Sequence, residues 1–183
     1  AGYGASSVEL VEAHGTSTKV GDATELSTLT RLWTNVASGD NIAVGSIKSQ
    51  IGHLKAAAGI AGIIKSVMAL HHRTIPPSAG FQTPNPTVDW QNIPFFVPTS
   101  PLEWPEPESH PRRAGVSAFG FGGTNFHIAL EGYNPEYHTG MAEDWQQRWN
   151  AYSKSASITA PSILDASATA SLTHDELKAI EGG

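Results

Sequence analysis

Apolar residues alternate with polar ones, or recur at helical intervals, over much of this chain. Five short runs rich in apolar and β-branched residues, each bounded by polar, Gly or Pro residues, predict strands. These runs are residues 8–13, 42–47, 95–97, 114–118 and 126–131. Asp22 and Glu25 have the spacing of a capping box, which predicts that a helix begins at Asp22. Its apolar face would carry Leu26, Leu29 and Trp33.

A second helix is predicted over residues 54–72, which are rich in Ala and Gly. Gly inside a helix costs about 1 kcal/mol relative to Ala, so these small residues indicate close backbone packing. We therefore expect a helix buried between layers. Proline-punctuated loops are predicted at 76–90 and 98–111. Strands that alternate with helices predict a layered α/β domain over residues 1–133.

The pattern changes after residue 133. Residues 134–152 predict a linker helix on which Trp145, Trp149 and Tyr152 form one aromatic face, a pattern more typical of packing than of ligand contact. Residues 153–183 predict a flexible Ser/Ala/Thr-rich tail, followed by the start of another short helix at a Thr173–Glu176 capping box.

Composition narrows the function. Charged residues make up 15% of the 183 residues, below the typical value of about 25%. The 11 Lys and Arg residues form no runs, which argues against a nucleic-acid or membrane-binding surface. The chain has no Cys, which excludes disulfides, thiolate metal sites and a cysteine nucleophile within it. His spacings typical of metal sites do not occur in the sequence, so we expect no metal.

The N-terminus has neither a basic segment nor a long apolar segment, so it does not resemble a signal peptide. The most apolar stretch, residues 56–70, is too short and too interrupted by charge to span a bilayer. We therefore expect a cytoplasmic protein. The absence of an initiator Met also leads us to expect a piece of a longer chain.

Three segments place polar or glycine-rich turns at the ends of apolar runs, where sites form in open α/β sheets. They are VEAHGTSTKVGDATEL at 11–26, SIKSQIGHLKAAAG at 46–59 and GVSAFGFGGTNFHIAL at 115–130. Two neutral imidazoles, from His14 and His53, could converge there and donate hydrogen bonds to one carbonyl oxygen. Taken singly, each His is more simply structural, and FGFGGTN is more simply a tight turn. His71 and His72 more simply offset a helix dipole than bind a metal.

Together, these segments resemble the C-terminal half of a β-ketoacyl synthase domain of the thiolase fold, over residues 1–133. The text GGTNFHIALEGY is similar to polyketide and polyunsaturated-fatty-acid synthases. The resemblance implies a layered α/β/α fold and decarboxylative Claisen condensation. It also implies an acyl carrier protein partner that supplies phosphopantetheine, with no cofactor bound directly, and a homodimer in the complete domain.

The resemblance also implies roles for individual residues. His14 and His53 would hold the thioester carbonyl during decarboxylation. Lys48 and Glu25 would form a charged pair that holds the first histidine in place. Thr16 and Thr18 would contact the pantetheine arm. The aromatic gate and oxyanion loop would consist of Phe121 with Gly120, Gly122 and Gly123.

The missing nucleophile is the main departure from the family pattern. The family carries its acyl chain on a Cys in the N-terminal half of the domain, so this chain alone is expected to be inactive and to require that half as a partner. A non-catalytic module that docks or scaffolds carrier protein stays open as an alternative. A decarboxylase that uses the histidines without the nucleophile is a third hypothesis. Acyl chain length is not specified by these residues.

Overall fold

A five-stranded sheet forms the centre of the computed structural model, which describes residues 2–33, 42–120, 122–139 and 147. Its strand order is β4-β2-β1-β6-β7. The bounds are β1 (Leu10–Glu12), β2 (Ile42–Gly45), β4 (Phe95–Phe96), β6 (Arg113–Phe119) and β7 (Asn125–Glu131). The first four strands are parallel, and β7 returns antiparallel to β6. All five predicted strands are present, with ends that differ by a few residues.

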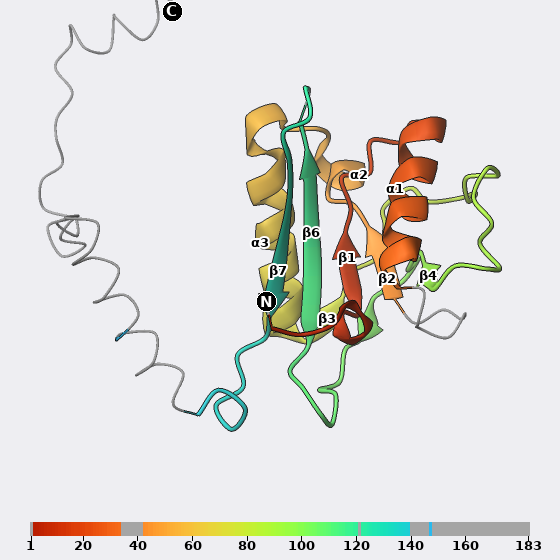
Figure 1. The fold of residues 1–183 in the computed structure, drawn as a ribbon. Coiled ribbons are helices and arrows are strands. Elements are labelled where there is room, and N and C mark those ends of the chain that lie inside the picture. The colour runs from red at the N-terminus through yellow and green to blue at the C-terminus, as the bar shows by residue number, and fades with distance from the viewer. Residues whose placement is uncertain (1, 34–41, 121, 140–146, 148–183) are drawn as a thin grey trace, which may run out of the picture. The chain divides into compact units, whose positions relative to one another are not determined.

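Two helices cover opposite faces of the sheet, which gives the three layers of the predicted α/β/α fold (Figure 1). Helix α1 (Lys19–Leu32) packs with Val11, Val44 and Phe95 of the sheet. Helix α3 (Ala58–His72) packs with Leu10, Ala43 and Ala114 from the same strands. Successive residues along β1, and likewise along β2, therefore pack into the cores on opposite faces of the sheet. This is expected for strands that are buried on both faces.

The first helix begins earlier than predicted. Thr18 is its N-cap, with a side-chain oxygen that accepts a hydrogen bond from the Gly21 N–H at 3.2 Å. The predicted start at Asp22 is therefore wrong. Asp22 and Glu25 belong to the helix, and their carboxylates interact with the loop before it instead of capping the helix.

The second predicted helix is divided. A four-residue helix α2 (Lys48–Ile51) comes first, then a 3₁₀ turn η2 (Lys55–Ala57), and α3 begins only at Ala58. The prediction of close packing at its small residues is confirmed. A Cβ at Gly62 would lie 3.2 Å from Val116 Cγ1, and one at Gly59 would lie 3.3 Å from Ala118 Cβ.

The expectation of a helix buried between layers is met on one side only within the described residues. Only the face of α3 toward the sheet is buried, whereas Ile60, Ile64, Val67 and Met68 are exposed. The sheet covers one side of the helix, and none of the described residues covers these four side chains.

Additional short elements complete the described part. A 3₁₀ turn, η1 (Ala5–Ser7), precedes β1. A two-stranded antiparallel sheet pairs β3 (Thr74–Ile75) with β5 (Leu102–Glu103), and β5 lies inside the 98–111 segment, which was predicted to be irregular. One compact unit ends at Tyr137. The predicted linker helix at 134–152 and flexible tail at 153–183 lie almost wholly outside the described residues, so the predicted domain division stays a prediction. No helix in the described ranges is long and apolar enough to cross a membrane.

Candidate active site

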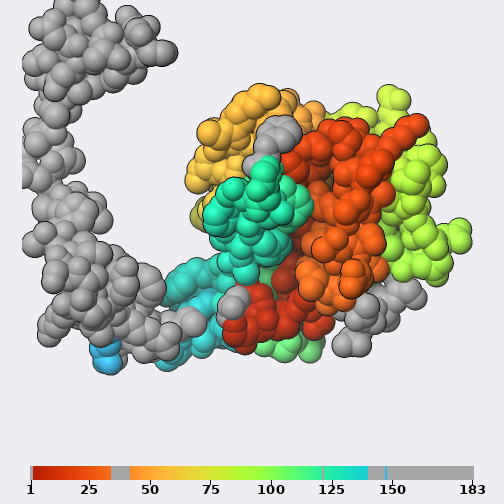
Figure 2. All heavy atoms as spheres, turned by 45° about the horizontal axis from the view of Figure 1, so that its top comes forward, coloured from red at the N-terminus to blue at the C-terminus, as the bar shows by residue number. Residues whose placement is uncertain are grey.

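The site lies where the parallel strands end, at the end of the sheet that Figure 2 brings forward. His14 lies two residues after the end of β1, and His53 lies in the turn between α2 and η2. Their ring centroids are 5.6 Å apart, with one ring edge-on to the other. The structure therefore brings together the two histidines that the sequence analysis selected from different motifs.

The hydrogen bonds of the two histidines define their tautomers. Nδ1 of His14 accepts a hydrogen bond from the Phe119 N–H at 3.3 Å, and Nδ1 of His53 accepts one from the Lys55 N–H at 3.0 Å. A neutral imidazole that accepts at Nδ1 carries its proton on Nε2. Each neutral ring can therefore donate a hydrogen bond from Nε2 to a third group.

Charge and burial favour the neutral form of His14. Its pKa is lowered first by burial, then by the positive charge of Lys48 and by His53, whereas Asp22 opposes the shift. A neutral imidazole at this position is a hydrogen-bond donor with no net charge. It can thus stabilise a negative charge that develops during a reaction.

We expect His14 to titrate below its ordinary pKa of 6.5. Because folding lowers this pKa, the contribution of His14 to stability is present above pH 6.5 and is lost as the pH falls through the lower folded value. NMR titration of the His Cε1–H resonances measures this, with His14→Gln identifying the His14 signal. A His14 pKa at or above 6.5 in the folded chain contradicts the prediction.

Glu25 holds the loop that carries His14. Its Oε1 accepts a hydrogen bond from the His14 N–H at 2.8 Å, and its Oε2 accepts one from the Gly15 N–H at 3.0 Å. Burial raises the pKa of this carboxyl, and the two N–H donors oppose that shift. Glu25 therefore acts on the backbone of the histidine loop.

The predicted charged pair of Lys48 and Glu25 is not among the close ion pairs of the described residues. The ion pairs of the described residues are Lys65–Glu12, Arg112–Glu106 and Arg113–Glu131, and none includes Lys48. The charges of Lys48 and Glu25 still attract each other over a longer distance, and each favours the ionised form of the other. The carboxylate is occupied by two backbone N–H groups, which is why it does not pair with the lysine directly.

Asp22 extends the same arrangement by one helical turn. Burial raises its pKa, while hydrogen bonding from the Ser17 and Thr16 backbone lowers it. The loop needs such support because Ser17 and Gly15 have positive φ angles of 60° and 44°. Two carboxylates of α1 therefore engage four consecutive residues, 14–17. This role of Asp22 was not predicted from the sequence, although the spacing of Asp22 from Glu25 was the available signal.

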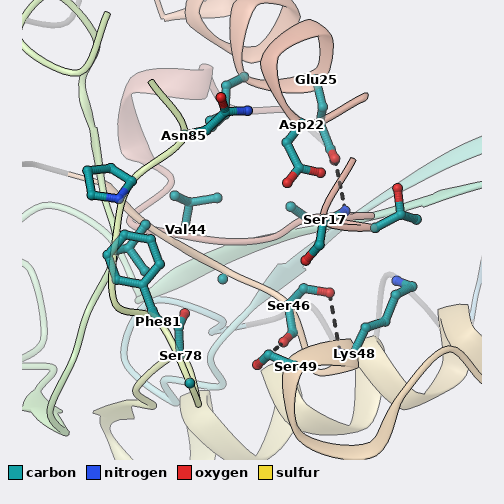
Figure 3. Close-up of a pocket in the computed structure, with 18 of the residues that line it drawn as sticks. Ser17, Asp22, Glu25, Val44, Ser46, Lys48, Ser49, Ser78, Phe81 and Asn85 are labelled. Atoms are coloured by element: carbon teal, nitrogen blue, oxygen red, sulfur yellow. Dashed lines mark hydrogen bonds between the residues drawn. The ribbon is translucent and has the colours of Figure 1, made fainter. Parts of the chain in front are cut away.

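A pocket of about 760 Å³ opens beside this loop (Figure 3). Asp22 and Glu25 of α1 lie at one wall, and Lys48 lies at another side. The exposed residues Thr16 and Thr18 also line the pocket. The facing wall comes from the 78–90 segment, which includes Phe81 and is tied to α1 by a 3.0 Å hydrogen bond from Asn85 Nδ2 to the Lys19 carbonyl. His53 also lines the pocket, so the predicted pantetheine contacts open into the same space as one histidine.

The glycine-rich turn joins β6 to β7. The Gly120 N–H donates to the Thr124 carbonyl at 2.8 Å, and Gly122 and Gly123 have positive φ angles of 80° and 88°. Side chains disfavour that conformation, which explains two of the glycines. Phe121, the predicted gate, lies outside the described residues. A different ring, that of Phe119, lies 5.3 Å from the His14 ring between centroids.

A buried ion pair close to the histidine loop was not predicted from the sequence. Glu12 of β1 and Lys65 of α3 lie 2.7 Å apart between Oε2 and Nζ. Each stands in the sequence as a charge within an apolar segment, which is a signal that could have identified the pair.

The other candidates are less clearly tied to chemistry. His71 and His72 pack edge-on at the end of α3, with centroids 5.0 Å apart. Within the described residues, no group of three or more His, Asp or Glu side chains is arranged to hold a metal. The predicted aromatic face of Trp145, Trp149 and Tyr152 lies outside the described part.

Comparison with known proteins identifies the family. Residues 1–82 match the family of the β-ketoacyl synthase C-terminal domain, and residues 84–182 match that of the ketoacyl-synthetase C-terminal extension. The chain belongs to the β-ketoacyl synthases. It corresponds to the C-terminal half of a ketosynthase domain, which confirms the resemblance and the thiolase-like fold.

Named relatives of this ketosynthase half are polyketide synthases. A phenolphthiocerol/phthiocerol polyketide synthase of Mycobacterium tuberculosis is 50% identical over 125 residues, 68% of this chain and 8% of that protein. The hybrid PKS-NRPS synthetase pytA of Aspergillus terreus is 47% identical over 125 residues, 68% of this chain and 19% of that protein. The ketosynthase half therefore spans only a small part of these relatives.

Solved ketosynthases show the same fold. Ketosynthase twelve of the bacillaene polyketide synthase of Bacillus amyloliquefaciens matches with a TM-score of 0.68 and 39% identity, over 72% of this chain and 24% of that chain. The module 6 ketosynthase of the Bacillus subtilis 168 bacillaene synthase matches with a TM-score of 0.68 and 42% identity, over 71% and 23%. The chain thus spans about a quarter of these ketosynthase structures.

Proposed function

We propose that this chain supplies the carbonyl-binding side of a ketosynthase that performs decarboxylative Claisen condensation. The observation that carries the proposal is the pair of adjacent imidazoles, His14 and His53, each with Nδ1 occupied and Nε2 able to donate. Two such donors fit one thioester oxygen. The substrate would be a malonyl-type unit carried on the phosphopantetheine arm of an acyl carrier protein.

In this reaction the bond between the malonyl carboxylate and its α-carbon breaks, and carbon dioxide leaves. The electron pair moves onto the thioester, which becomes an enolate, and negative charge develops on its oxygen. The enolate carbon then attacks an acyl-cysteine thioester and expels the cysteine thiolate, which leaves a 3-ketoacyl thioester on the carrier protein. Hydrogen-bond donors fixed in advance at the developing charge lower the barrier more than they stabilise the neutral substrate.

The remaining residues of the site would orient the reactants. Glu25 fixes the backbone of the His14 loop, and the charge of Lys48 adds to burial in lowering the pKa of His14. Thr16 and Thr18 would contact the pantetheine arm, because both are exposed at the pocket. Gly120, Gly122 and Gly123 with Phe121 would form the loop beside the thioester. We place the reaction in the cytoplasm.

The cysteine nucleophile must come from another part of the domain, because this chain contains no Cys. We therefore propose that the N-terminal ketosynthase half covers the exposed apolar side of α3. The residues Ile60, Ile64, Val67 and Met68, here called the α3 apolar face, are each about half exposed. An apolar hollow of about 550 Å³ continues this face toward Ile51 and Leu54.

The sheet extends the same face. Phe126 and Ile128 of β7 pair with Ala118 and Val116 of β6, which are the residues in contact with α3. Because directly opposed residues lie on one side of a sheet, Phe126 and Ile128 point to the side that carries α3. Both are exposed, so a strip of apolar strand lies next to an apolar helix. Apolar patches of this kind mark contact surfaces.

We expect Ile64→Glu to prevent association with the N-terminal half while leaving this chain folded. Ile64 is 57% exposed here, so the substitution removes little packing from the chain itself. Leu32→Glu is the matched control, because Leu32 is 64% exposed but belongs to α1, on the other face of the sheet. Co-purification of the two halves measures association. If the N-terminal half co-purifies equally with Ile64→Glu and Leu32→Glu, the α3 apolar face is not the docking surface.

The proposed reaction is tested in the complete domain that contains this chain, with an acyl-loaded enzyme and malonyl carrier protein. Intact-mass analysis of the carrier protein should show the 3-ketoacyl product. Carrier protein that binds but gains no product, with no carbon dioxide released, would instead support a docking or scaffold module. The homodimer expected for the complete domain is measured in the same preparation by light scattering.

A further inference from the structure

A carboxylate lies almost fully buried at the end of β1, two residues before His14. Glu12 is 2% exposed and is the last residue of the strand. Its two oxygens bind different elements: Oε1 accepts a hydrogen bond from the Ile47 N–H at 2.6 Å, and Oε2 accepts one from Lys65 Nζ at 2.7 Å. One side chain therefore links β1, the segment that leads into α2, and α3.

The fold makes room for this carboxylate. A Cβ at Gly62 of α3 would lie 3.0 Å from Glu12 Cγ, so the helix can approach the strand only where it has no side chain. The Lys65 side chain is 10% exposed, and a Cβ at Gly45 would lie 3.5 Å from its Nζ. An ion pair enclosed in this way is costly to break, because removing one partner leaves the other buried without compensation.

The contact with Ile47 fixes the entry to the second motif. Ile47 is the N-cap of α2, and the next residue is Lys48; the same segment continues through Ile51 to His53. The Ile47 side chain is not involved, since the bond is made by the backbone N–H. The carboxylate therefore acts on the course of the chain that presents Lys48 and His53.

The charges around Lys48 support the same connection. Burial lowers the pKa of Lys48, the negative charges of Glu12 on β1 and Glu25 on α1 raise it, and the positive charge of Lys65 on α3 lowers it. The charge of Lys48 in turn helps to lower the pKa of His14. Glu12 thus influences both the place and the charge of the lysine beside the histidine pair.

We propose that Glu12 is a positioning residue: its carboxylate fastens the segment that carries Lys48 and His53 to the strand end that carries His14, and Lys65 holds the carboxylate in place. The proposal rests on the proposed function, in which Lys48 acts as a charged group and the two histidines act as neutral hydrogen-bond donors. It adds two residues that contact neither substrate nor pantetheine.

The test is made in the complete domain by comparing Glu12→Gln, Lys65→Met and the conservative Lys65→Arg. We expect Glu12→Gln to lower kcat about 10- to 100-fold, because small displacements of reacting groups have effects of that size. The KM for malonyl carrier protein should change less than kcat, because the backbone of Thr16 and Ser17 is held by Asp22 of α1 and not by Glu12. Glu9→Gln is the matched control: Glu9 lies just before the same strand, but it accepts a hydrogen bond from Trp104 Nε1.

The pH profile separates positioning from general destabilisation. Loss of the Glu12 charge lowers the pKa of Lys48, so the alkaline limb of kcat should move to lower pH in Glu12→Gln. Loss of the Lys65 charge raises that pKa, so the limb should move to higher pH in Lys65→Met. Lys65→Arg should keep the parent profile. Thermal unfolding of each variant is recorded in parallel, so that rates are compared only between folded proteins.

Opposite shifts, with a fall in kcat that exceeds the change in KM, support the proposal. Shifts in the same direction, or a kcat for Glu12→Gln equal to that of Glu9→Gln, overturn it while the parent enzyme still condenses. A parent enzyme without condensation overturns the proposed function instead. If Glu12→Gln does not fold, the Lys65→Met and Lys65→Arg pair decides: a shift to higher pH in Lys65→Met alone supports the proposal, and equal profiles overturn it.

Discussion

Replacing His53 with alanine in the complete ketosynthase is expected to lower the rate of condensation by about 10²- to 10³-fold, the usual effect of removing one donor to a developing oxyanion. His53 is suited to this role because its Nδ1 is held by the Lys55 N–H and its Nε2 is left to donate. Its ring also packs edge-on against His14, so both donors reach the same region. The rate is measured as a single turnover of acyl-loaded enzyme with malonyl carrier protein.

The loss should be chemical and not structural. His53 is exposed, so water can replace it at the Lys55 N–H, and substitutions at exposed positions usually change stability by less than about 0.5 kcal/mol. His71→Ala is the matched control, because His71 is exposed at the far end of α3. A loss below tenfold in His53→Ala, or an equal loss in His71→Ala, would contradict the role assigned to His53.

Replacing Glu25 with alanine is expected to lower the free energy of unfolding by about 2–4 kcal/mol. The carboxylate is 9% exposed and accepts from the His14 and Gly15 N–H groups. A buried N–H that loses its acceptor costs about 1–3 kcal/mol, and because the two N–H groups left here are part-buried, their sum should fall in the lower part of the range for two. Urea unfolding of this chain, followed by circular dichroism, measures the change.

Two further variants show whether hydrogen bonding is the cause. Glu25→Gln keeps one acceptor oxygen and should lose less than Glu25→Ala. Glu108→Ala makes the same substitution at an exposed position in the 98–111 segment and should change stability by less than about 0.5 kcal/mol. If Glu25→Ala and Glu108→Ala lose the same stability, Glu25 does not contribute the stability that its contacts indicate.

The strands of this fold could be predicted because each is a short apolar run with a clear boundary. The start of the first helix was harder to predict. Asp22 and Glu25 have the spacing of a capping box but bind the loop before the helix, and Thr18 is the N-cap. The break between Ile51 and Ala58 was also missed: Gly52 and Lys55 have positive φ angles of 75° and 54°, and a non-glycine residue in that conformation leaves little signal in a single sequence.

At the site, the meeting of His14 and His53 could be predicted from their places after parallel strands. Their tautomers could not, because these depend on backbone N–H donors of Phe119 and Lys55. The contacts of Glu25 are a similar case: the family resemblance implied a charged pair with Lys48, whereas the carboxylate accepts hydrogen bonds from the loop backbone. Backbone donors are present at every residue, so the sequence pattern does not show which of them a carboxylate will bind.

The exposed apolar side of α3 follows from the same reasoning. Its sequence predicts a helix that is buried between layers, and the sheet of this chain covers one side only. The observed burial of α3 is therefore smaller than the predicted burial. This agrees with a chain that spans about a quarter of the solved ketosynthases it matches, with 24% and 23% coverage. The sequence therefore indicated a packing surface before any partner was considered.

The central claim is that this chain provides two carbonyl-binding histidines to a cysteine carried elsewhere in the domain. The most direct measurement mixes this chain with a separately expressed N-terminal half and follows 3-ketoacyl carrier protein by intact mass. We predict product only when both halves are present, and none when His14 and His53 are both replaced by alanine. Product from this chain alone, or undiminished product from the double variant in the mixture, would contradict the claim.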